Sequence, residues 1–471
     1  EFVQVTRQTG IDVLVSDEID LLIAAQTHRR ELDSGVEFSQ TYYPNQKALL
    51  VREGDGAAVL AHMADRKVGV VLGTPAEQAA LDWQRRVDYA FTIQTFLTLD
   101  RAIAALTSSE IDGVVDSRVR LTRIITQPGI ARFVDEPVQQ EPYAIAMRRQ
   151  DVHLRNLVNR TLQYLFNSGR VNEIHQAHFS GASYPQNTFV TWANIGDEAP
   201  RPEQAATDVP FPAQYALPRV RSSGQLRVAG LVELAPDAPE SERRLDTANR
   251  ALVNALAMRW GVSVVAVPSS GGNPADLVAS GEADLAVGVQ PDWSYADRVD
   301  FTSRYILHGL RLMIESNSNI GGFGDLRNKW VGIFASEPGV SEVIRAEAER
   351  ARAIIDDVFT IAREQDAAFA MLAENNVDAV LGDSMKLIPH IEANPEQLEL
   401  LTDGEGRAIW YSRSAISMAV PRNDIDFRLL VEYTLQELAR EGVLTQALLP
   451  VMQAQDFPRF EIWPGSSDYL G

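Results

Sequence analysis

The chain has 471 residues and a formal net charge of −21 at pH 7, with 45% hydrophobic and 23% charged residues, a composition typical of a globular protein of about two or three domains. The acidic balance argues against nucleic acid or an anionic membrane as the main partner, because both bind basic surfaces. The absence of cysteine excludes disulfides, cysteine-ligated metals and thiol nucleophiles, and no apolar run approaches the roughly 18 residues that span a bilayer.

The first part of the chain alternates short apolar runs with helix-compatible stretches. Residues 1–5 are typical of a strand, as are residues 68–72. Residues 101–106 have the helical pattern and lead into another apolar run at residues 111–115. Strand, helix and strand at these spacings indicate parallel α/β sheets with helices on both faces.

A segment rich in proline, residues 180–224, follows. Proline removes backbone donors and disfavours helix, so we expect an extended linker. Its aromatic residues indicate that the linker packs on a domain instead of remaining fully solvated. These residues are Phe189, Trp192, Phe211 and Tyr215. The tail from about residue 453 has the same character.

The second part begins with a strand pattern at residues 226–230 and a helical pattern at residues 248–256. A β pattern at residues 331–334 and a helical one at residues 367–372 then repeat the alternation of the first part. The fold class predicted for the whole chain is therefore α/β.

Five blocks recur in the same order, which indicates two copies of one domain. The paired blocks are 16–23 with 280–287, 38–42 with 301–305, 68–70 with 331–333, 110–115 with 375–381, and 161–165 with 434–438. In this alignment Glu1 falls opposite Ser263, so the first copy lacks the leading strand and helix of the second. We therefore expect a truncated or incompletely observed version of a longer polypeptide, whose missing part would hold any signal sequence or membrane anchor.

The ordered blocks resemble the extracytoplasmic solute-binding proteins of the polar amino-acid family (family 3), which serve ABC importers. The residues that carry the resemblance are DLLIAAQT (20–27), FSQTYY (38–43), KVGVVLGT (67–74) and EIDGVVDS (110–117), with EADLAVGV (282–289), VDFTSRY (299–305), KWVGIFAS (329–336) and NVDAVLGDS (376–384) in the second copy. The resemblance implies tandem periplasmic-binding-protein-like (type II) domains, each with two α/β lobes joined by a hinge.

The same resemblance implies the domain boundaries. The first domain is 1–180, with lobe 1 at 1–50 and 141–180 and lobe 2 at 51–140. A linker at 181–224 precedes the second domain, 225–452, whose lobe 1 is 225–315 and 415–452 and whose lobe 2 is 316–414. Residues 453–471 form a tail.

A zwitterionic ligand in such a cleft needs an arginine for its carboxylate, donors at a helix N-terminus for the same group, and a carboxylate for its ammonium. The family's arginine position is Leu32 here, and Tyr295 or Ala296 in the second copy, so neither copy keeps the arginine in place. Arg30, with Arg29 beside it, either substitutes or belongs to a solvated surface pair.

The other site positions follow from the same resemblance. Thr74 after Gly73 is either a ligand donor or a plain helix cap, whereas Glu337 in the second copy would repel a carboxylate. Asp383 matches the ammonium partner, although aspartate also ends strands in turns. The candidate residues are Gln8, Ala25, Gln26, Thr27, Arg30, Gly73, Thr74 and Asp116 in the first copy and Asp383 in the second.

The sequence thus favours a non-enzymatic, extracytoplasmic protein that binds a small polar solute such as an amino acid, mainly with its first copy, for a membrane permease of the ABC type. No cofactor, metal or nucleic acid is expected; His175 and His178 lack a third ligand nearby. Two alternatives stay open. One is a structural or assembly protein with vestigial clefts, and the other is the sensor ectodomain of a signalling receptor.

Overall fold

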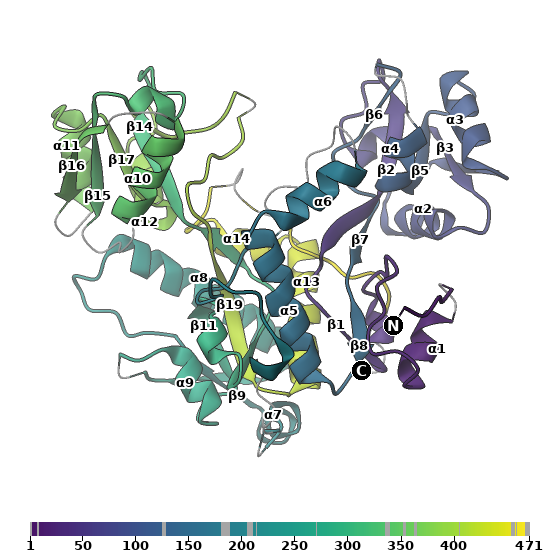
Figure 1. Cartoon of the computed structure of the whole chain (residues 1–471), viewed down its shortest axis with the longest axis horizontal. Coiled ribbons are helices and arrows are strands. Elements are labelled where there is room, and N and C mark those ends of the chain that lie inside the picture. Colours follow the sequence, from purple (N-terminus) through teal and green to yellow (C-terminus); the bar gives the residue numbers. More distant parts are fainter. Residues whose placement is uncertain are drawn as a thin grey trace. The chain divides into compact units, whose positions relative to one another are not determined.

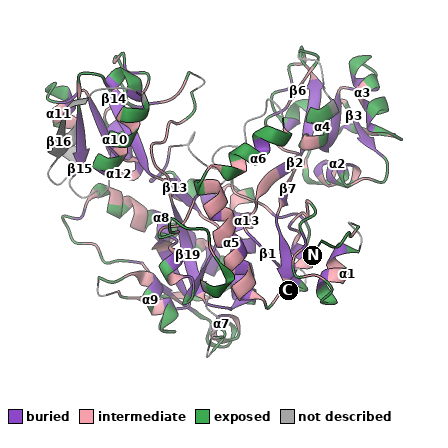
Figure 2. Ribbon diagram, viewed as in Figure 1, coloured by how far each residue is buried: buried purple, intermediate pink, exposed green. Residues whose placement is uncertain are grey.

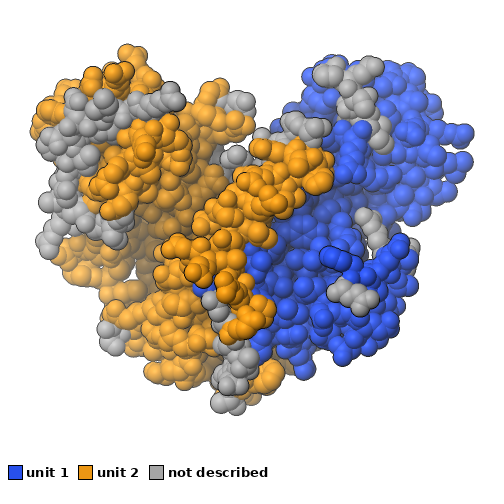
Figure 3. All heavy atoms as spheres, in the orientation of Figure 1, with its two compact units in different colours: residues 1–162, 461–471 blue, residues 163–460 orange. Residues whose placement is uncertain are grey.

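The computed structural model describes residues 2–466, apart from residues 7–8, 125–128, 180–188, 205–210, 213, 270, 335–339, 352–354, 362–364, 405, 454–456 and 458. The chain forms two compact units (Figure 3): unit 1 comprises residues 1–162 and 461–471, and unit 2 comprises residues 163–460. No described helix combines the length and the apolar character needed to cross a membrane.

The elements that begin in unit 1 are α1 (Gly10–Val15), η1 (Arg30–Leu32), β1 (Val36–Phe38), β2 (Tyr43–Arg52), η2 (Leu60–Met63), β3 (Lys67–Val71), α2 (Pro75–Arg86), β4 (Thr92–Phe96), α3 (Leu99–Thr107), β5 (Gly113–Ser117), α4 (Arg118–Ile124), β6 (Ala131–Phe133), β7 (Gln139–Tyr143), β8 (Ala146–Arg148) and α5 (Val152–Asn167). The boundary between the units falls inside α5.

Unit 2 continues with α6 (Arg170–His178), η3 (Pro202–Gln204), α7 (Ala216–Ser223), β9 (Gln225–Ala229), α8 (Glu240–Trp260), β10 (Ser263–Val267), α9 (Pro274–Ala279), β11 (Leu285–Val289), η4 (Trp293–Tyr295), β12 (Val299–Phe301), β13 (Ile306–His308), β14 (Leu310–Glu315), η5 (Phe323–Leu326), β15 (Lys329–Phe334), α10 (Val340–Ala351), β16 (Ile355–Ile361), α11 (Gln365–Ala373), β17 (Ala379–Asp383), α12 (Ser384–Ala393), β18 (Leu398–Leu400), β19 (Ser414–Pro421), α13 (Ile425–Arg440) and α14 (Val443–Leu448).

One sheet has the same strand order in both copies. The order is β4-β3-β5-β2-β6 in the first copy and β16-β15-β17-β14-β18 in the second. In the first copy β3 and β5 run parallel, and β2 runs antiparallel to β5. In the second copy β15 and β17 run parallel, and β14 runs antiparallel to β17. The fold is therefore α/β and occurs twice in the chain, as the repeated blocks predicted.

Helices cover both faces of this sheet in the first copy (Figure 1). Val68 and Val70 pack in one hydrophobic cluster with α2, whereas Val71 and Val114 pack in another with α3. Neighbouring residues of a strand point to opposite faces, so the two clusters lie on the two sides of the sheet. Figure 2 shows the consequence, since the strands are buried while the outer faces of the helices are exposed.

The other sheet differs between the copies. β1 pairs antiparallel with β8, with Phe38 opposite Ala146, and β12 pairs with β19 in the same way, with Phe301 opposite Ala419. In the second copy this pair belongs to a six-stranded sheet with β9, β10, β11 and β13, whereas β1 and β8 form a two-stranded sheet.

The strand predicted at residues 1–5 is not formed by residues 2–5, which precede α1 without regular structure. The reason is the lack of a partner. In the second copy the corresponding strand β10 pairs with β9, and the described part of unit 1 holds no counterpart of β9. An unpaired strand leaves its backbone donors and acceptors without ladder partners.

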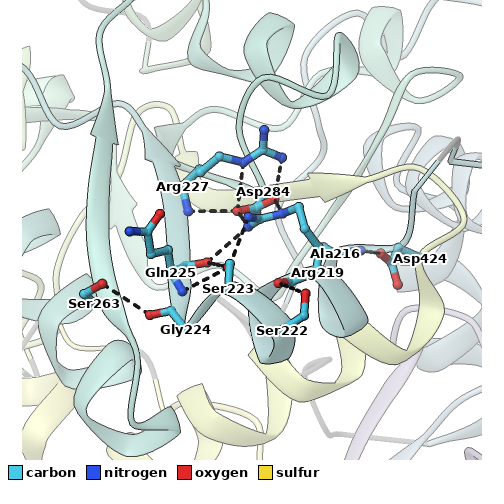
Figure 4. Close-up of polar contacts among 10 residues, drawn as sticks. All are labelled: Ala216, Arg219, Ser222, Ser223, Gly224, Gln225, Arg227, Ser263, Asp284 and Asp424. Atoms are coloured by element: carbon cyan, nitrogen blue, oxygen red, sulfur yellow. Dashed lines mark hydrogen bonds and ion pairs between the residues drawn. The ribbon is translucent and has the colours of Figure 1, made fainter.

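The linker is not extended throughout, because α7 lies within it. Arg219 of α7 donates from Nε to Oδ1 of Asp284 at 2.7 Å, and the same carboxylate pairs with Arg227 of β9 at 2.8 Å (Figure 4). Asp284 is 2% exposed. A buried carboxylate needs a partner of opposite charge, and the two arginines supply it. The linker therefore packs on the second copy as expected, although this part of it is helical.

Candidate functional site

The hinge of the first copy consists of the two strands that leave the β1–β8 sheet for the larger sheet. β2 and β7 pair antiparallel, with Tyr43 opposite Tyr143 and Asn45 opposite Glu141. These strands join the two lobes, so residues on them stand where a ligand between the lobes would be held.

A group of polar side chains, here called the hinge cluster, gathers on these strands: Asn45, Lys47, Ser117, Glu141 and Tyr143. The amide Nδ2 of Asn45 lies 3.1 Å from Oγ of Ser117, 2.5 Å from Oε2 of Glu141 and 2.7 Å from the hydroxyl oxygen of Tyr143, so its two hydrogens are shared among three acceptors. Lys47 Nζ lies 2.8 Å from Oε1 of Glu141. Because this lysine and this glutamate neutralise each other, the cluster offers mainly uncharged donors and acceptors.

Two tyrosines beside the cluster keep their hydroxyl protons throughout the neutral range. Burial raises the pKa of Tyr43, and the positive charges of Arg118 and Arg123 offset only part of that effect. Burial likewise raises the pKa of Tyr42, whose hydroxyl accepts a hydrogen bond from the backbone of Ala25. Both phenols therefore remain neutral groups that can donate or accept.

Three of the predicted residues lie beside this cluster. The carbonyl of Gln26 accepts the N–H of Ala144 at 3.0 Å, and Thr27 forms an antiparallel bridge with Tyr143. Ala25, just before them, has a φ of 49°. The segment from lobe 1 that the sequence singled out is thus held against the hinge strand, while Gln8 lies outside the described residues.

The N-terminus of α2 carries its own carboxylate. The N–H of Gly73 donates to Oε2 of Glu77 at 2.7 Å, which places a negative charge where a ligand carboxylate would bind. The hydroxyl of Thr74 donates back to the carbonyl of Val71 at 2.7 Å and makes no hydrogen bond that caps the helix. Thr74 therefore occupies the N-cap position of α2, although its side chain makes no capping hydrogen bond. The corresponding segment of the second copy, which includes Glu337, lies outside the described residues.

The two aspartates are not equivalent in the structure. Lys47 of β2 is paired with Ser117, and Leu310 at the matching position of β14 is paired with Asp383. Ser117 and Asp383 also directly precede the helices α4 and α12. The counterpart of Asp383 in the first copy is therefore Ser117, one residue after Asp116.

Asp116 is buried and its Oδ2 lies 3.1 Å from an amino group of Arg120, four residues later. Its Oδ1 accepts the N–H of Ser117 at 2.6 Å. The carboxylate that was predicted to hold a ligand ammonium is thus already paired with a cation of its own chain.

Asp383 is engaged in a similar way. Its Oδ2 lies 2.6 Å from Nδ1 of His308, and its Oδ1 accepts the N–H of Met385 at the start of α12. Burial on its own would raise the pKa of Asp383, but the charge and hydrogen bond of His308 lower it below its usual value. His308 and Asp383 occupy the places of Asn45 and Ser117, which form the matching contact in the first copy.

Arg30 is not a solvated surface residue. It opens η1 and is 5% exposed, and its backbone N–H donates to the carbonyl of Pro464 at 2.9 Å. Its neighbour Arg29 is partly exposed and pairs with Glu31. Burial thus excludes the surface-pair interpretation for Arg30, and only Arg29 fits it.

The sequence did not single out Asn45, Glu141, Tyr143 or His308. These residues lie on the connecting strands, whose pattern resembles that of any half-buried strand. Ser117 is the last residue of the block EIDGVVDS. The sequence comparison matched Asp383 with its neighbour Asp116 instead, because both are aspartates. An alignment of the two copies without a gap at this point places Asn45 opposite His308 and Ser117 opposite Asp383. That alignment would have identified Asn45 and Ser117.

Residues 1–181 match the family model described as bacterial extracellular solute-binding proteins, family 3. This is a class of binding proteins rather than enzymes. The ABC transporter glutamine-binding protein GlnH of Bacillus subtilis is 24% identical over 176 residues, 37% of this chain and 63% of that protein. The arginine-binding extracellular protein ArtP of the same organism is 22% identical over 174 residues, 36% of this chain and 67% of that protein.

The chain spans 56% of a glutamine-binding protein of Geobacillus stearothermophilus, with 26% identity over 150 residues, or 32% of this chain. Among solved structures, the periplasmic domain of BvgS from B. pertussis is similar over 96% of this chain and 82% of that chain, with 16% identity and a TM-score of 0.33. The second substrate-binding domain of a putative amino acid ABC transporter from Streptococcus pneumoniae covers 48% of this chain and 100% of its own, with 19% identity and a TM-score of 0.39.

Proposed function

Since residues 1–181 match a family of solute-binding proteins, we propose that the first copy binds a small polar solute at the hinge cluster, outside the cytoplasm, for delivery to an ABC-type importer. The observation that carries this proposal is the convergence of uncharged polar groups on the two strands that join the lobes. Asn45 and Ser117 are 4% and 5% exposed, so a solute reaches them when the lobes open and is enclosed when they close.

The chemistry of the cluster favours a solute with an uncharged polar group, such as a carboxamide or hydroxyl. Lys47 and Glu141 satisfy each other's charge at 2.8 Å, and the helix N-terminus beside Gly73 already carries the carboxylate of Glu77. An amide of the solute would meet the amide of Asn45 and the hydroxyls of Ser117 and Tyr143 as donor and acceptor. Two of the relatives are named as glutamine-binding proteins, which is in keeping with a carboxamide.

The second copy is proposed to be degenerate as a binding module. The place of the cluster is taken there by His308 and Asp383, which are hydrogen-bonded to each other at 2.6 Å. Arg298, near the position expected for a carboxylate clamp, pairs with Asp276 at 3.1 Å and stacks on Tyr295. The charged groups that could hold an amino acid are thus engaged within the chain.

The test is calorimetric titration of the full chain with a panel of polar amino acids and their amides. Ser117→Ala removes one hydrogen-bonding hydroxyl without changing the fold and should weaken binding about 10-fold. Asp383→Asn changes the matching position of the second copy and should leave the affinity unchanged. Binding of no panel member to the wild-type chain, or a loss confined to Asp383→Asn, would contradict the proposal.

A sensor ectodomain is the second candidate, and one observation favours it. After the second copy, residues 461–466 belong again to unit 1. A conformational change in one copy can therefore act on the other through the connected backbone. A coding sequence that continues beyond Gly471 into a membrane span and a signalling domain would select this candidate over the importer.

A further inference from the structure

Residues 461–464, here called the strap, follow the second copy and pack on the first. Oε1 of Glu461 accepts a hydrogen bond from the hydroxyl of Thr41 at 2.8 Å. The next residue, Ile462, donates its N–H to Oε1 of Gln140 at 3.0 Å. Gln140 lies on β7 and Thr41 lies two residues before β2, so the strap contacts one hinge strand and the segment that leads into the other.

The indole of Trp463 anchors the strap. It stacks on the ring of His28 with 3.7 Å between centroids, and His28 stacks in turn on Phe38 of β1 at 4.2 Å. Trp463 is 5% exposed. Pro464 then accepts the N–H of Arg30 through its carbonyl at 2.9 Å. The strap thus covers part of the small hydrophobic core of lobe 1, which has only a two-stranded sheet.

The strap and the hinge cluster lie on opposite faces of β7. Glu141 and Tyr143 are two residues apart, point to the same side and contact Asn45. Gln140 directly precedes Glu141 in the strand, so its side chain points to the other side, where it accepts the N–H of Ile462. The hinge strand is therefore held from the front by the cluster and from behind by the strap.

The strap follows directly on a residue that packs in unit 2. Phe460, the residue before it, packs against the hydrophobic cluster of unit 2 that contains Leu252 and Leu435. The following residue, Glu461, already bonds to Thr41 in unit 1. The contact with unit 2 and the contact with unit 1 are thus made by adjacent residues, so a movement of Phe460 acts directly on Glu461.

We propose that residues 461–464 are a built-in partner of the first copy, which completes its lobe 1 and holds its hinge strand in place, and that the end of the second copy thereby controls lobe movement in the first. The surface that receives the strap is made by His28, Arg30, Thr41 and Gln140, with Phe38 stacked beneath His28. It fits one occupant of defined chemistry, a short extended segment with an acidic residue followed two positions later by tryptophan. This inference concerns the fold and holds whether or not a solute binds.

The full chain, which has no cysteine, allows a direct test by paired spin labels. Asp12→Cys on α1 and Arg85→Cys on α2 place one exposed label in each lobe of unit 1. Pulsed electron resonance should give a narrow distance distribution in the parent chain and a broad one after Trp463→Ala. Ser466→Ala, at an exposed position just past the strap, is the control and should leave the distribution narrow.

Amide hydrogen exchange supplies the second measurement. Trp463→Ala should speed exchange at residues 27–42 by at least 10-fold and leave β15 and β17 of unit 2 unchanged. If Trp463→Ala impairs folding, Thr41→Val, which removes one hydroxyl and keeps the shape, should give a smaller change at the same residues. The proposal is overturned if neither variant alters exchange at residues 27–42 or the distance distribution.

Discussion

Two residues with positive φ have the same role in the two copies. Ala25 has a φ of 49° and its N–H bonds the hydroxyl of Tyr42. Gly288 has a φ of 71° and its N–H bonds the hydroxyl of Tyr305 at 2.7 Å. A side chain in this region of φ costs about 1 kcal/mol that glycine avoids.

Ala25→Gly should therefore stabilise unit 1 by about 0.5 kcal/mol, after the greater freedom of glycine in the unfolded chain is subtracted. Urea unfolding monitored by circular dichroism measures the change. Ala24→Gly is the control, because Ala24 has no positive φ and should only lose stability. Equal destabilisation by both substitutions would show that Ala25 carries no backbone strain.

The contact of Asp383 with His308 should make the stability of unit 2 depend on pH in the acid range. The pKa of Asp383 is below its ordinary value of 3.8 in the fold, so the unfolded chain takes up the proton first as the pH falls. The stabilisation is complete above about pH 5 and is lost as the pH drops through the folded pKa. Between pH 5 and pH 2 the wild-type chain should lose more stability than Asp383→Asn in acid unfolding curves. Parallel curves would contradict this.

At the scale of elements, much of the fold could be predicted because local pattern and tertiary packing agree. The helices expected at residues 101–106, 248–256 and 367–372 lie within α3, α8 and α11, and the apolar runs at 68–72 and 331–334 coincide with β3 and β15. These segments pack on both faces of a sheet, so their apolar residues recur at the period of their own structure. The order of the five blocks then indicated the duplication that the strand orders show.

Elements whose form depends on a partner could not be predicted. Residues 2–5 have a strand pattern, but the described part of unit 1 offers them no strand to pair with. The proline at 218 predicted a non-helical segment, although it falls in the first turn of α7, where proline is tolerated. One site residue was predicted wrongly for the same reason. Asp116 was chosen for its charge, whereas the pairing of Lys47 with Ser117 sets the true counterpart of Asp383. Which residues face each other on neighbouring strands depends on how the strands pair in the folded protein, and a single sequence does not show this.

At the scale of the whole molecule, the hydrophobic cores predict how the chain unfolds. The cluster that contains Leu50 lies wholly in unit 1 and the cluster that contains Leu252 lies wholly in unit 2. Units with separate cores melt separately unless a large interface couples them. Lobe 1 of unit 1 rests on a two-stranded sheet, which is marginal on its own. We therefore expect two calorimetric transitions, with unit 1 melting first.

Matched substitutions assign the two transitions. Leu50 and Leu252 are both 0% exposed, and replacing such a leucine with alanine removes about 3 kcal/mol, which lowers a melting temperature by about 5–10 °C for units of this size. Leu50→Ala should shift only the lower transition and Leu252→Ala only the upper one. One transition that both substitutions shift equally would mean that the two units unfold as a single cooperative body.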